Sequence, residues 1–507
     1  MEIVDALLDP KTYKENIKKV RLIQTHTSWV FLTGRYAYKI KKPVNFGFLN
    51  YTTLKKRKHF CLRELELNRK LSPDIYLGVV PVVKKDDKIT LGNGGKVLDY
   101  AVKMVELPQS RIMTNLLKKK KISYTTVDEI ARIVADFHSK TPPADKKYGS
   151  LRIIKYNWDE NFFQTKDFKD ELVTKFDLIK CDIDRFMKKK KDIFKERIEK
   201  NKIRECHGDL HSGNIFITDK VHIFDCIEFN PRFSCSDTTS EIAFFTMDLD
   251  FYHRKDLSDF FTEKYIQYSK DEHLLSLLDF YKCYRAYVRG KVTSFKLLDP
   301  HIENFEKEEA KKTAKSYFDL SYLYSKSFFE KPKLIAMMGL PGVGKTYVAN
   351  RLGAELNCFN LKTDVIRKDI AGIPVEEHIQ CSFRKGIYSK NASFDTYTEM
   401  FKRAEKYLRY GKSCILDATF AKKDMLQKVV ELADRLNLEY RVIHCKCSDE
   451  VVLNRLKKRK KEIDASDATE GIYYKMKKIS EPPEMPVIEI DTSQEIGKII
   501  KKIIRCI

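Results

Sequence analysis

Eight residues in the last third of the chain have the types and spacing of a loop that binds phosphate. They are Gly339-Leu340-Pro341-Gly342-Val343-Gly344-Lys345-Thr346, between an apolar run at 334–338 and a helical pattern at 347–356. Glycines allow backbone N–H groups to converge on phosphate oxygens, and a helix N-terminus adds partial positive charge. We therefore predict that Gly339, Gly342 and Gly344 shape a nucleotide-binding loop. Lys345 would reach the outer phosphates, and Thr346 would hold Mg²⁺.

Carboxylates and arginines follow this loop where they would meet the same nucleotide. Asp417 ends a predicted strand, and an aspartate there polarises the Mg²⁺ shell. Asp364 and Arg367 follow the second predicted strand, and a base and a cation at this spacing suit an acceptor hydroxyl with an anionic neighbour. The alternative for this pair is an N-cap aspartate with a surface arginine. Arg455 and Arg459 lie on a basic helix, which predicts either a mobile lid over the phosphates or a solvated surface.

These residues resemble the small P-loop kinase group that includes polynucleotide 5′-kinases, gluconate kinase and the zeta-toxin type enzymes. The resemblance covers about residues 333 to 500. It implies ATP and Mg²⁺ at Lys345 and Thr346, a catalytic base at Asp364, an acceptor contact at Arg367, and a lid formed by Arg455 and Arg459. None of these motifs identifies the acceptor.

A second set of candidate catalytic residues lies in the first half of the chain. In His207-Gly208-Asp209-Leu210-His211-Ser212-Gly213-Asn214, the residues Asp209 and Asn214 are five positions apart, and Asp225 follows an apolar run at 221–224. One carboxylate would orient or deprotonate the acceptor hydroxyl, while an amide and a second carboxylate would hold Mg²⁺ on the ATP phosphates. Zinc at His207 and His211 is a weaker alternative, because no cysteine or carboxylate pattern completes that site.

This segment resembles the catalytic loop of the aminoglycoside phosphotransferase family, which is related in fold to protein kinases. The resemblance covers about residues 15 to 325. It implies a base at Asp209, Mg²⁺ ligands at Asn214 and Asp225, a phosphate-pairing Lys39 bound to Glu64, and an adenine-binding hinge at 105–107. Lys41 would lie on the same strand face and is the alternative to Lys39. Thr25-His26-Thr27-Ser28 stands where a GxGxxG loop is expected, so a domain that binds nucleotide without turnover stays an alternative.

The order of the two parts resembles a bacterial family in which an aminoglycoside phosphotransferase-like domain precedes a P-loop ATP-binding domain of the AAA or polynucleotide-kinase type. The matching segments are Ile40-Lys41-Lys42-Pro43-Val44, Asn157-Trp158 and Asp225-Cys226-Ile227-Glu228-Phe229-Asn230. We expect an α+β kinase-like domain with two lobes over residues 1–328. An α/β P-loop NTPase domain with a parallel sheet is expected over residues 333–507, after a charged, proline-containing junction.

The composition of the chain indicates which classes of protein and of partner are compatible with it. The chain has 507 residues, and 96 Lys and Arg against 72 Asp and Glu give a formal net charge of +24. This charge suits nucleic acid, although solvated lysine-rich helix faces would give the same balance. The first residues lack a signal-peptide pattern, and no apolar run approaches the ~18–20 residues of a membrane span. The 12 cysteines form no CxxC pair, so we expect a cytoplasmic protein with reduced thiols.

Together these patterns predict an ATP-dependent phosphotransferase that uses ATP and Mg²⁺ at two sites and acts on the hydroxyl of an unidentified small molecule. Two alternatives stay open. The first is a nucleic-acid 5′-end kinase, which the basic charge favours. The second is a regulatory ATPase that senses nucleotide.

Overall fold

The chain folds into two compact units, and each unit is made of several separate segments of the sequence. The computed structural model describes residues 2–169, 171–379, 384–459 and 467–507. Unit 1 contains Met1–Ile122, Arg132–Asn157 and Lys191–Phe245, and unit 2 contains Ser123–Ala131, Trp158–Lys190 and Thr246–Ile507. Three helices therefore begin in one unit and end in the other: α4 (Tyr124–Lys140), α5 (Leu151–Thr165) and α9 (Thr238–Phe251). The predicted domain boundary between residues 328 and 333 stays a prediction.

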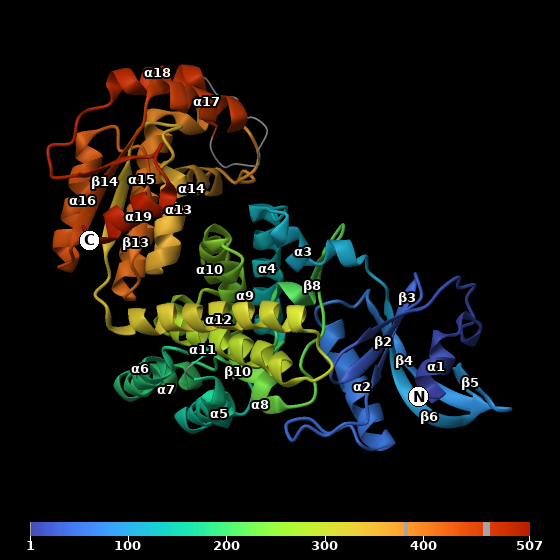
Figure 1. The fold of residues 1–507 in the computed structure, drawn as a ribbon. Helices are drawn as coiled ribbons and strands as arrows, with labels where there is room; N and C mark the ends of the chain where they lie inside the picture. The colour runs from blue at the N-terminus through green and yellow to red at the C-terminus, as the bar shows by residue number, and fades with distance from the viewer. Residues whose placement is uncertain (1, 170, 380–383, 460–466) are drawn as a thin grey trace. The chain divides into compact units, whose positions relative to one another are not determined.

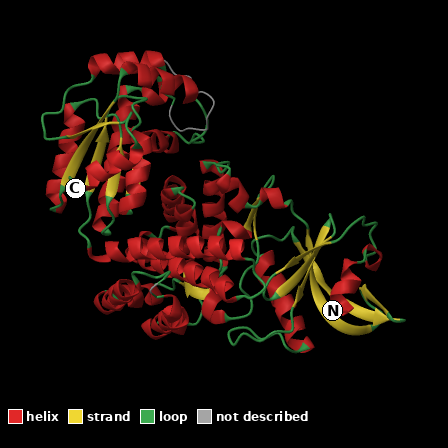
Figure 2. Ribbon diagram, viewed as in Figure 1, coloured by secondary structure: helices red, strands yellow, loops and turns green. Residues whose placement is uncertain are grey.

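Unit 1 begins with a six-stranded antiparallel sheet in the order β1-β2-β3-β6-β4-β5 (Figure 1, Figure 2). The strands are β1 (Arg21–Gln24), β2 (Ser28–Leu32), β3 (Tyr36–Lys41), β4 (Tyr76–Lys85), β5 (Lys88–Leu91) and β6 (Lys96–Val105). Short apolar or aromatic runs mark five of them in the sequence. β5 and the short helix α1 (Glu2–Leu8) are not marked in this way, because a four-residue edge strand and a two-turn helix carry little periodic signal.

Alternation along β3 places its two lysines on one face of this sheet. Tyr38 and Ile40 belong to the hydrophobic core on one side. Lys39 and Lys41 point to the opposite side, because successive side chains of a strand alternate between faces. On that side α2 (Leu54–Arg69) packs against β4 and β6. The strand pattern thus aims both lysines at one helix.

The second part of unit 1 carries the loops singled out by the sequence. β7 (Ile203–Glu205) pairs with β10 (Cys235–Asp237), and β8 (Ile215–Ile217) pairs with β9 (Val221–Ile223), both in antiparallel register. Residues 207–214 therefore connect two strand pairs, and Asp225 follows β9. The remaining helices of this part are α3 (Met113–Lys118), α7 (Lys191–Glu199) and α8 (Pro231–Ser234).

Unit 2 contains a helical part built on aromatic packing. Its helices include α6 (Phe176–Lys189), α10 (Lys255–Ser269), α11 (Leu275–Ser294) and α12 (Asn304–Lys326). Trp158 is fully buried, stacks on Phe162 at a centroid distance of 5.3 Å and meets Tyr287 edge-on at 5.6 Å. Such rings supply much of the burial energy of a core. Over the described residues, none of the helices combines the length and apolar character needed to cross a membrane.

The rest of unit 2 is a parallel sheet in the order β12-β13-β11-β14-β15 (Figure 1). The strands are β11 (Leu334–Met338), β12 (Phe359–Lys362), β13 (Cys414–Asp417), β14 (Tyr440–Lys446) and β15 (Ile488–Asp491). The central strand β11 is buried along its whole length, as expected for a sheet covered on both faces. The helices of this part are α13 (Lys345–Leu356), α14 (Thr363–Ile370), α15 (Lys390–Arg409), α16 (Lys423–Leu436), α17 (Asp449–Arg459), α18 (Glu470–Ile479) and α19 (Ile496–Ile504). The predicted parallel sheet is confirmed.

Candidate functional site

The glycine-rich loop joins the central strand β11 to α13 at the carboxyl end of the parallel sheet. The backbone φ is +142° at Gly339, +82° at Gly342 and +95° at Gly344, in a region that other residues rarely adopt. A Cβ at Gly339 would lie 2.5 Å from the backbone oxygen of Cys445. The positive φ therefore favours glycine at all three positions. At Gly339 the close backbone oxygen also leaves no room for a side chain.

Three polar side chains lie at the end of this loop: those of Lys345 and Thr346, which belong to it, and that of Asp417 on β13. Asp417 lies opposite Met337 in the parallel pairing of β13 with β11, and the Thr346 hydroxyl donates to its Oδ2 at 2.6 Å. Lys345 Nζ donates to the backbone oxygen of Leu340 at 3.0 Å. Burial raises the pKa of Asp417, and the Lys345 ammonium opposes the rise. The site thus combines the hydroxyl, carboxylate and ammonium groups that suit Mg²⁺ and phosphate.

Arg455 holds the same loop from α17. Its Nη1 donates to the backbone oxygen of Val343 at 2.9 Å, and its Nη2 donates to that of Thr492 at 2.7 Å. No sequence pattern singles out Thr492, whose hydroxyl also donates to the backbone oxygen of Val343. The predicted contact of Arg455 with ATP stays a prediction. The side chain of Arg459 lies outside the described residues.

Asp364 and Arg367 lie on α14, as the sequence pattern predicted. The alternative of an N-cap aspartate with a surface arginine is wrong, because Lys362 is the N-cap and Arg367 is 8% exposed. Arg367 Nη1 donates to the oxygen of Ile387 at 2.9 Å, and its guanidinium lies 4.8 Å from the Tyr388 ring centroid. Its Nε is buried without a hydrogen-bond partner among the described residues. Burial and then the charge of Asp364 raise the pKa of Tyr388.

The far end of α14 is bound to the helical part of unit 2. Asp369 pairs with Lys264 of α10 and with Arg403 of α15, the latter at 2.6 Å. Arg403 also pairs with Glu263 of α10 at 2.7 Å. All four side chains are at most 13% exposed. These ion pairs fix the helix that carries Asp364.

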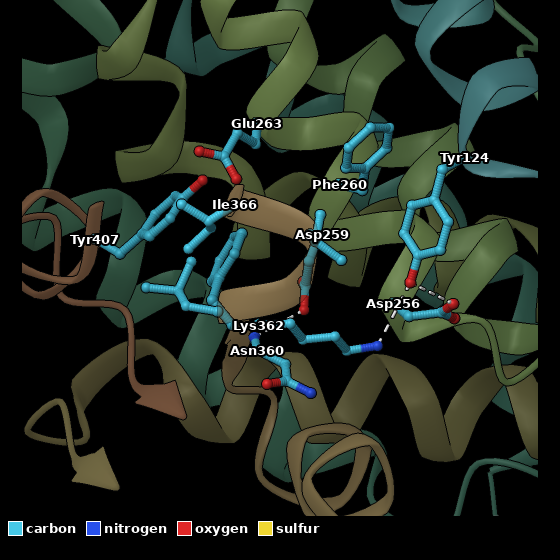
Figure 3. A pocket seen from close by; sticks show the side chains of 12 residues that line it. Tyr124, Asp256, Asp259, Phe260, Glu263, Asn360, Lys362, Ile366 and Tyr407 are labelled. Carbon is cyan, nitrogen blue, oxygen red and sulfur yellow. Dashed lines mark hydrogen bonds between the residues drawn. The ribbon is translucent and has the colours of Figure 1, made fainter. Parts of the chain in front are cut away.

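A small pocket lies in the same region, between α10 and β12, α14 and α15 (Figure 3). The backbone N–H of Asn360 donates to Asp259 at 3.0 Å. The hydroxyl of Tyr407 and the Oδ1 of Asn360 are buried and have no partner in the described part of the chain. None of the site residues predicted from the sequence lines this pocket. We therefore assign it to the packing of α10 against the sheet.

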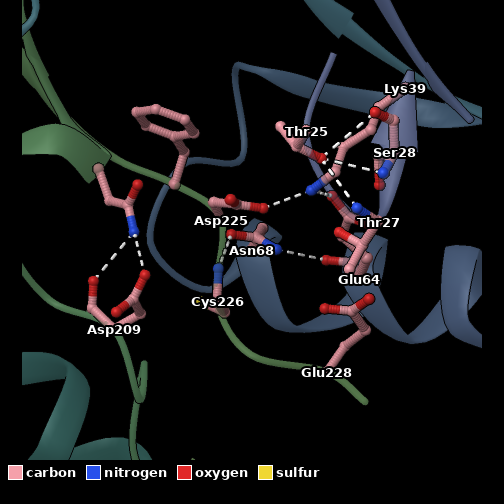
Figure 4. Close-up of polar contacts among 12 residues, drawn as sticks. Thr25, Thr27, Ser28, Lys39, Glu64, Asn68, Asp209, Asp225, Cys226 and Glu228 are labelled. Carbon is pink, nitrogen blue, oxygen red and sulfur yellow. Dashed lines mark hydrogen bonds and ion pairs between the residues drawn. The ribbon is translucent and has the colours of Figure 1, made fainter. Parts of the chain in front are cut away.

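Unit 1 brings together the predicted Lys39, Glu64 and Asp225 (Figure 4). Lys39 Nζ lies 2.9 Å from Glu64 Oε1 and also pairs with Asp225. Burial lowers the pKa of Lys39, but the carboxylates of Asp225 and Glu64 outweigh it and hold that pKa well above its ordinary value. The turn containing Thr25, Thr27 and Ser28 lies beside Lys39. Lys39 is thus charged and oriented by two carboxylates, and its pairing with phosphate stays a prediction.

Lys41, the predicted alternative to Lys39, forms a second branch of this network. Its Nζ lies 2.6 Å from Glu64 Oε2, and it pairs with Glu228. The Tyr51 hydroxyl donates to Glu228 Oε1 at 2.5 Å. Burial would raise the pKa of Glu64, but the ammonium groups of Lys39 and Lys41 together hold it at about 2. One buried glutamate therefore binds both lysines of β3.

Asp209 and Asn214 meet within the predicted catalytic loop. Asn214 Nδ2 donates to Asp209 Oδ2 at 3.0 Å (Figure 4), and His211 Nε2 lies 3.4 Å from the same oxygen. His207 Nε2 lies 2.8 Å from the backbone oxygen of Phe224, next to Asp225, whose φ is +67°. The two histidines considered for zinc are thus occupied with loop contacts.

Glu241 of α9 binds the backbone of this loop, a role that the sequence did not reveal. Its carboxylate accepts from the backbone N–H of His207 at 3.1 Å and of Gly208 at 2.7 Å. His138 Nε2 lies 3.0 Å from its Oε1. His138, Cys206 and Glu241 are the group among the described residues with metal-ligand spacing. Because the Glu241 oxygens already accept these bonds, we assign the group to support of the loop.

Comparisons with known proteins match one region of unit 2 to a family model and most of the chain to uncharacterized relatives. Residues 334–483 match a family model described as AAA domain. Uncharacterized protein Rv2004c of Mycobacterium tuberculosis (strain ATCC 25618 / H37Rv) is 28% identical over 438 residues, which cover 85% of each chain. A gluconokinase from Sinorhizobium meliloti 1021 is 17% identical, with a TM-score of 0.25, over 34% of this chain and 90% of its own. The APS kinase CysC of Mycobacterium tuberculosis is 14% identical, with a TM-score of 0.27, over 34% of this chain and 96% of its own. The family match and the parallel sheet identify a P-loop domain in this region.

Proposed function

We propose that the protein is an ATP-dependent phosphotransferase with two nucleotide sites, which transfers the γ-phosphoryl group to a hydroxyl of a small molecule. The observation that carries the proposal is the contact of Lys39 with Glu64 and Asp225 in unit 1. In kinases a lysine held by a glutamate positions the phosphates, and an aspartate nearby holds the metal. A kinase-like first domain is part of this proposal.

Mg²⁺ fits the donors of the first site. Hard cations prefer carboxylate and amide oxygens, which Asn214 and Asp225 supply. The Lys39 and Lys41 network holds two ammonium groups against the carboxylates of Glu64, Asp225 and Glu228. This excess of negative charge would be relieved by a bound divalent ion, which would also neutralise charge on the transferring phosphate.

Asp209 would act as the base of the first site. Asn214 and His211 hold its Oδ2, and Glu241 fixes the backbone just before it. The acceptor oxygen forms a bond to the γ-phosphorus while the bond from that phosphorus to the bridging oxygen breaks, and ADP leaves. The acceptor proton passes to the Asp209 carboxylate. Positioning of these groups accounts for the rate increase.

The second site would use the same chemistry on a different fold. Lys345 and the loop N–H groups would bind the phosphates, while Thr346 and Asp417 would hold Mg²⁺. Asp364 would serve as base. The buried Nε of Arg367 has no protein partner among the described residues, and a guanidinium edge of this kind suits an anionic group on the acceptor.

Measurement of phosphate transfer by purified variants tests the proposal. Wild type, Asp209→Asn and Lys345→Ala are incubated with radiolabelled ATP, Mg²⁺ and pooled metabolites or 5′-hydroxyl RNA. Exposed residues provide the matched controls Asp219→Asn and Lys501→Ala. We expect each site variant to lose a separate acceptor-dependent activity while both controls retain it. ATP hydrolysis without any labelled acceptor would instead support the regulatory ATPase.

A nucleic-acid 5′-end kinase is the second candidate, and the net charge of +24 favours it. Binding that rests on phosphate contacts weakens steeply as salt rises. An oligonucleotide titration at increasing salt therefore decides this candidate. Affinity that does not change with salt, or labelling of metabolites but never of RNA, would exclude it.

A further inference from the structure

The turn between β1 and β2 stands where a kinase has a glycine-rich phosphate loop, but its backbone donors are already in use. The N–H of Thr25 donates to the backbone oxygen of Ser28 at 3.0 Å. The N–H groups of Thr27 and Ser28 donate to the Thr25 hydroxyl at 3.3 and 2.9 Å. A glycine-rich loop binds phosphate through N–H groups of this kind. A phosphate beside this turn therefore requires another source of positive charge.

Lys42 binds this turn through both its backbone and its side chain. It lies one residue past β3, in the segment at 40–44 that the sequence singled out without a role for Lys42. Its backbone N–H donates to the oxygen of Thr27 at 2.8 Å, and its Nζ donates to the oxygen of Thr25 at 2.6 Å. The ammonium also lies 5.5 Å from the ring centroid of Trp29. An ammonium group has several N–H donors, so it can bind Thr25 and a ligand together.

The charge of Lys42 is not balanced in the way that the charges of its neighbours are. Burial lowers the pKa of Lys39 and of Lys41, but the carboxylates that pair with them outweigh it and raise both values. Lys42 has no carboxylate partner in the described part of the chain, and burial lowers its pKa. An opposite charge close to such a group stabilises its charged form. A phosphate group beside Lys42 would supply that charge.

The position of the turn connects Lys42 with the first site. The turn lies beside Lys39, which pairs with Glu64 and Asp225 (Figure 4). Lys42 follows the end of β3, so the alternation of side chains along the strand does not decide its direction. Its bond to Thr25 instead directs the ammonium to the turn. Lys39 and Lys42 therefore bring two ammonium groups to the same part of unit 1 from opposite ends of one short segment.

We infer that Lys42 is a second phosphate-binding lysine of the first site and that its ammonium takes the role of the backbone donors of a glycine-rich loop. The inference rests on the proposed function of that site. Lys39 would bind the phosphates from β3, and Lys42 would bind them from the turn. Because its ammonium also binds Thr25, the same side chain would hold the turn beside the phosphates. Fixed positive charge of this kind stabilises the transferring phosphoryl group.

Calorimetric binding of a non-hydrolysable ATP analogue with Mg²⁺ tests the inference. All variants carry Lys345→Ala, which is expected to remove binding at the second site. The variants are Lys42→Met, Lys42→Arg and the control Lys88→Met, which changes an exposed lysine on β5 of the same sheet. Loss of a hydrogen bond to a charged group predicts affinity lower by about 10- to 100-fold in Lys42→Met. Lys42→Arg should restore most of the affinity, and the control should bind like its parent.

Adenosine, measured as a competitor of the analogue, separates phosphate binding from support of the turn. Lys42→Met should bind adenosine as its parent does, because adenosine carries no phosphate. Equal losses for adenosine and the analogue would mean that Lys42 only supports the turn, and the inference would then be overturned. Affinity of Lys42→Met for the analogue equal to that of the control would overturn it as well.

Acetylation of the wild-type chain gives a readout that does not depend on the folding of a variant. The ATP analogue should slow the reaction of Lys42 with acetic anhydride, followed by mass spectrometry, and should leave that of Lys88 unchanged. An equal rate at Lys42 with and without the analogue contradicts the inference. Binding that is lost in Lys39→Met but kept in Lys42→Met leaves the proposed function intact and overturns the inference alone. Absence of analogue binding in the Lys345→Ala parent overturns both.

Discussion

Replacement of Glu64 by glutamine tests the network that defines the first site. Glu64 is fully buried and binds Lys39 and Lys41 through its two oxygens. Its pKa is held at about 2, against an ordinary value of 4.5. Since each pKa unit corresponds to about 1.4 kcal/mol, the ionised form contributes roughly 3 kcal/mol to the folding of unit 1 at neutral pH. We expect the substitution Glu64→Gln to lower the free energy of unfolding by about that amount.

Urea unfolding at several pH values is the assay. Trp29 lies on β2, beside the β3 strand that carries both lysines, whereas Trp158 belongs to unit 2. In a Trp158→Phe background, fluorescence therefore reports on the sheet of unit 1. The matched control is Glu66→Gln, on the same helix with a side chain 60% exposed, where we expect a loss of at most about 0.5 kcal/mol.

The pH dependence has a definite sign. Because the folded pKa of Glu64 is lowered, its contribution is present above the unfolded value and is lost as pH falls from about 5 towards 2. The difference between wild type and Glu64→Gln should shrink from roughly 3 kcal/mol at pH 7 to about 1 kcal/mol at pH 3. A loss equal to that of Glu66→Gln, or a difference that does not change with pH, would refute this reasoning.

Three further outcomes are expected in unit 2. Thr346→Ala should weaken Mg²⁺-dependent ATP binding by about 10- to 100-fold in calorimetry, and binding measured without Mg²⁺ should change far less. Gly339→Ala should lose more stability than Gly411→Ala in thermal unfolding, because both glycines have positive φ but a Cβ meets backbone only at the former; equal losses would contradict the steric argument. Asp369→Asn should destabilise unit 2 by about 3 kcal/mol in urea unfolding, because it leaves Arg403 with one fewer buried partner. Burial would raise the pKa of Asp369 but its cations hold it low, so this loss should shrink as pH falls below about 4; a loss that is independent of pH would contradict it.

The parallel sheet of unit 2 could be predicted because its strands are short apolar runs next to turn residues. The apolar run at 334–338 is β11, and the predicted strand that Asp417 ends is β13. The order of the strands was not predictable from these runs, since pairing depends on contacts between distant segments. The burial of Arg367 was missed for the same reason, because the residues that cover it come from a later segment around Tyr388.

The choice between Lys39 and Lys41 shows what the sequence alone leaves open at the first site. Period-two alternation places both on one face, so either fits a phosphate-pairing role. The structure separates them by burial. Lys41 is 1% exposed and is enclosed by Glu64 and Glu228, whereas Lys39 pairs with Asp225, whose side chain is 42% exposed. A nucleotide can displace the outer carboxylate from Lys39 without breaking a buried pair, which costs far more. Under the proposed function, Lys39 is therefore the better candidate for phosphate, and Lys41 would fix Glu64.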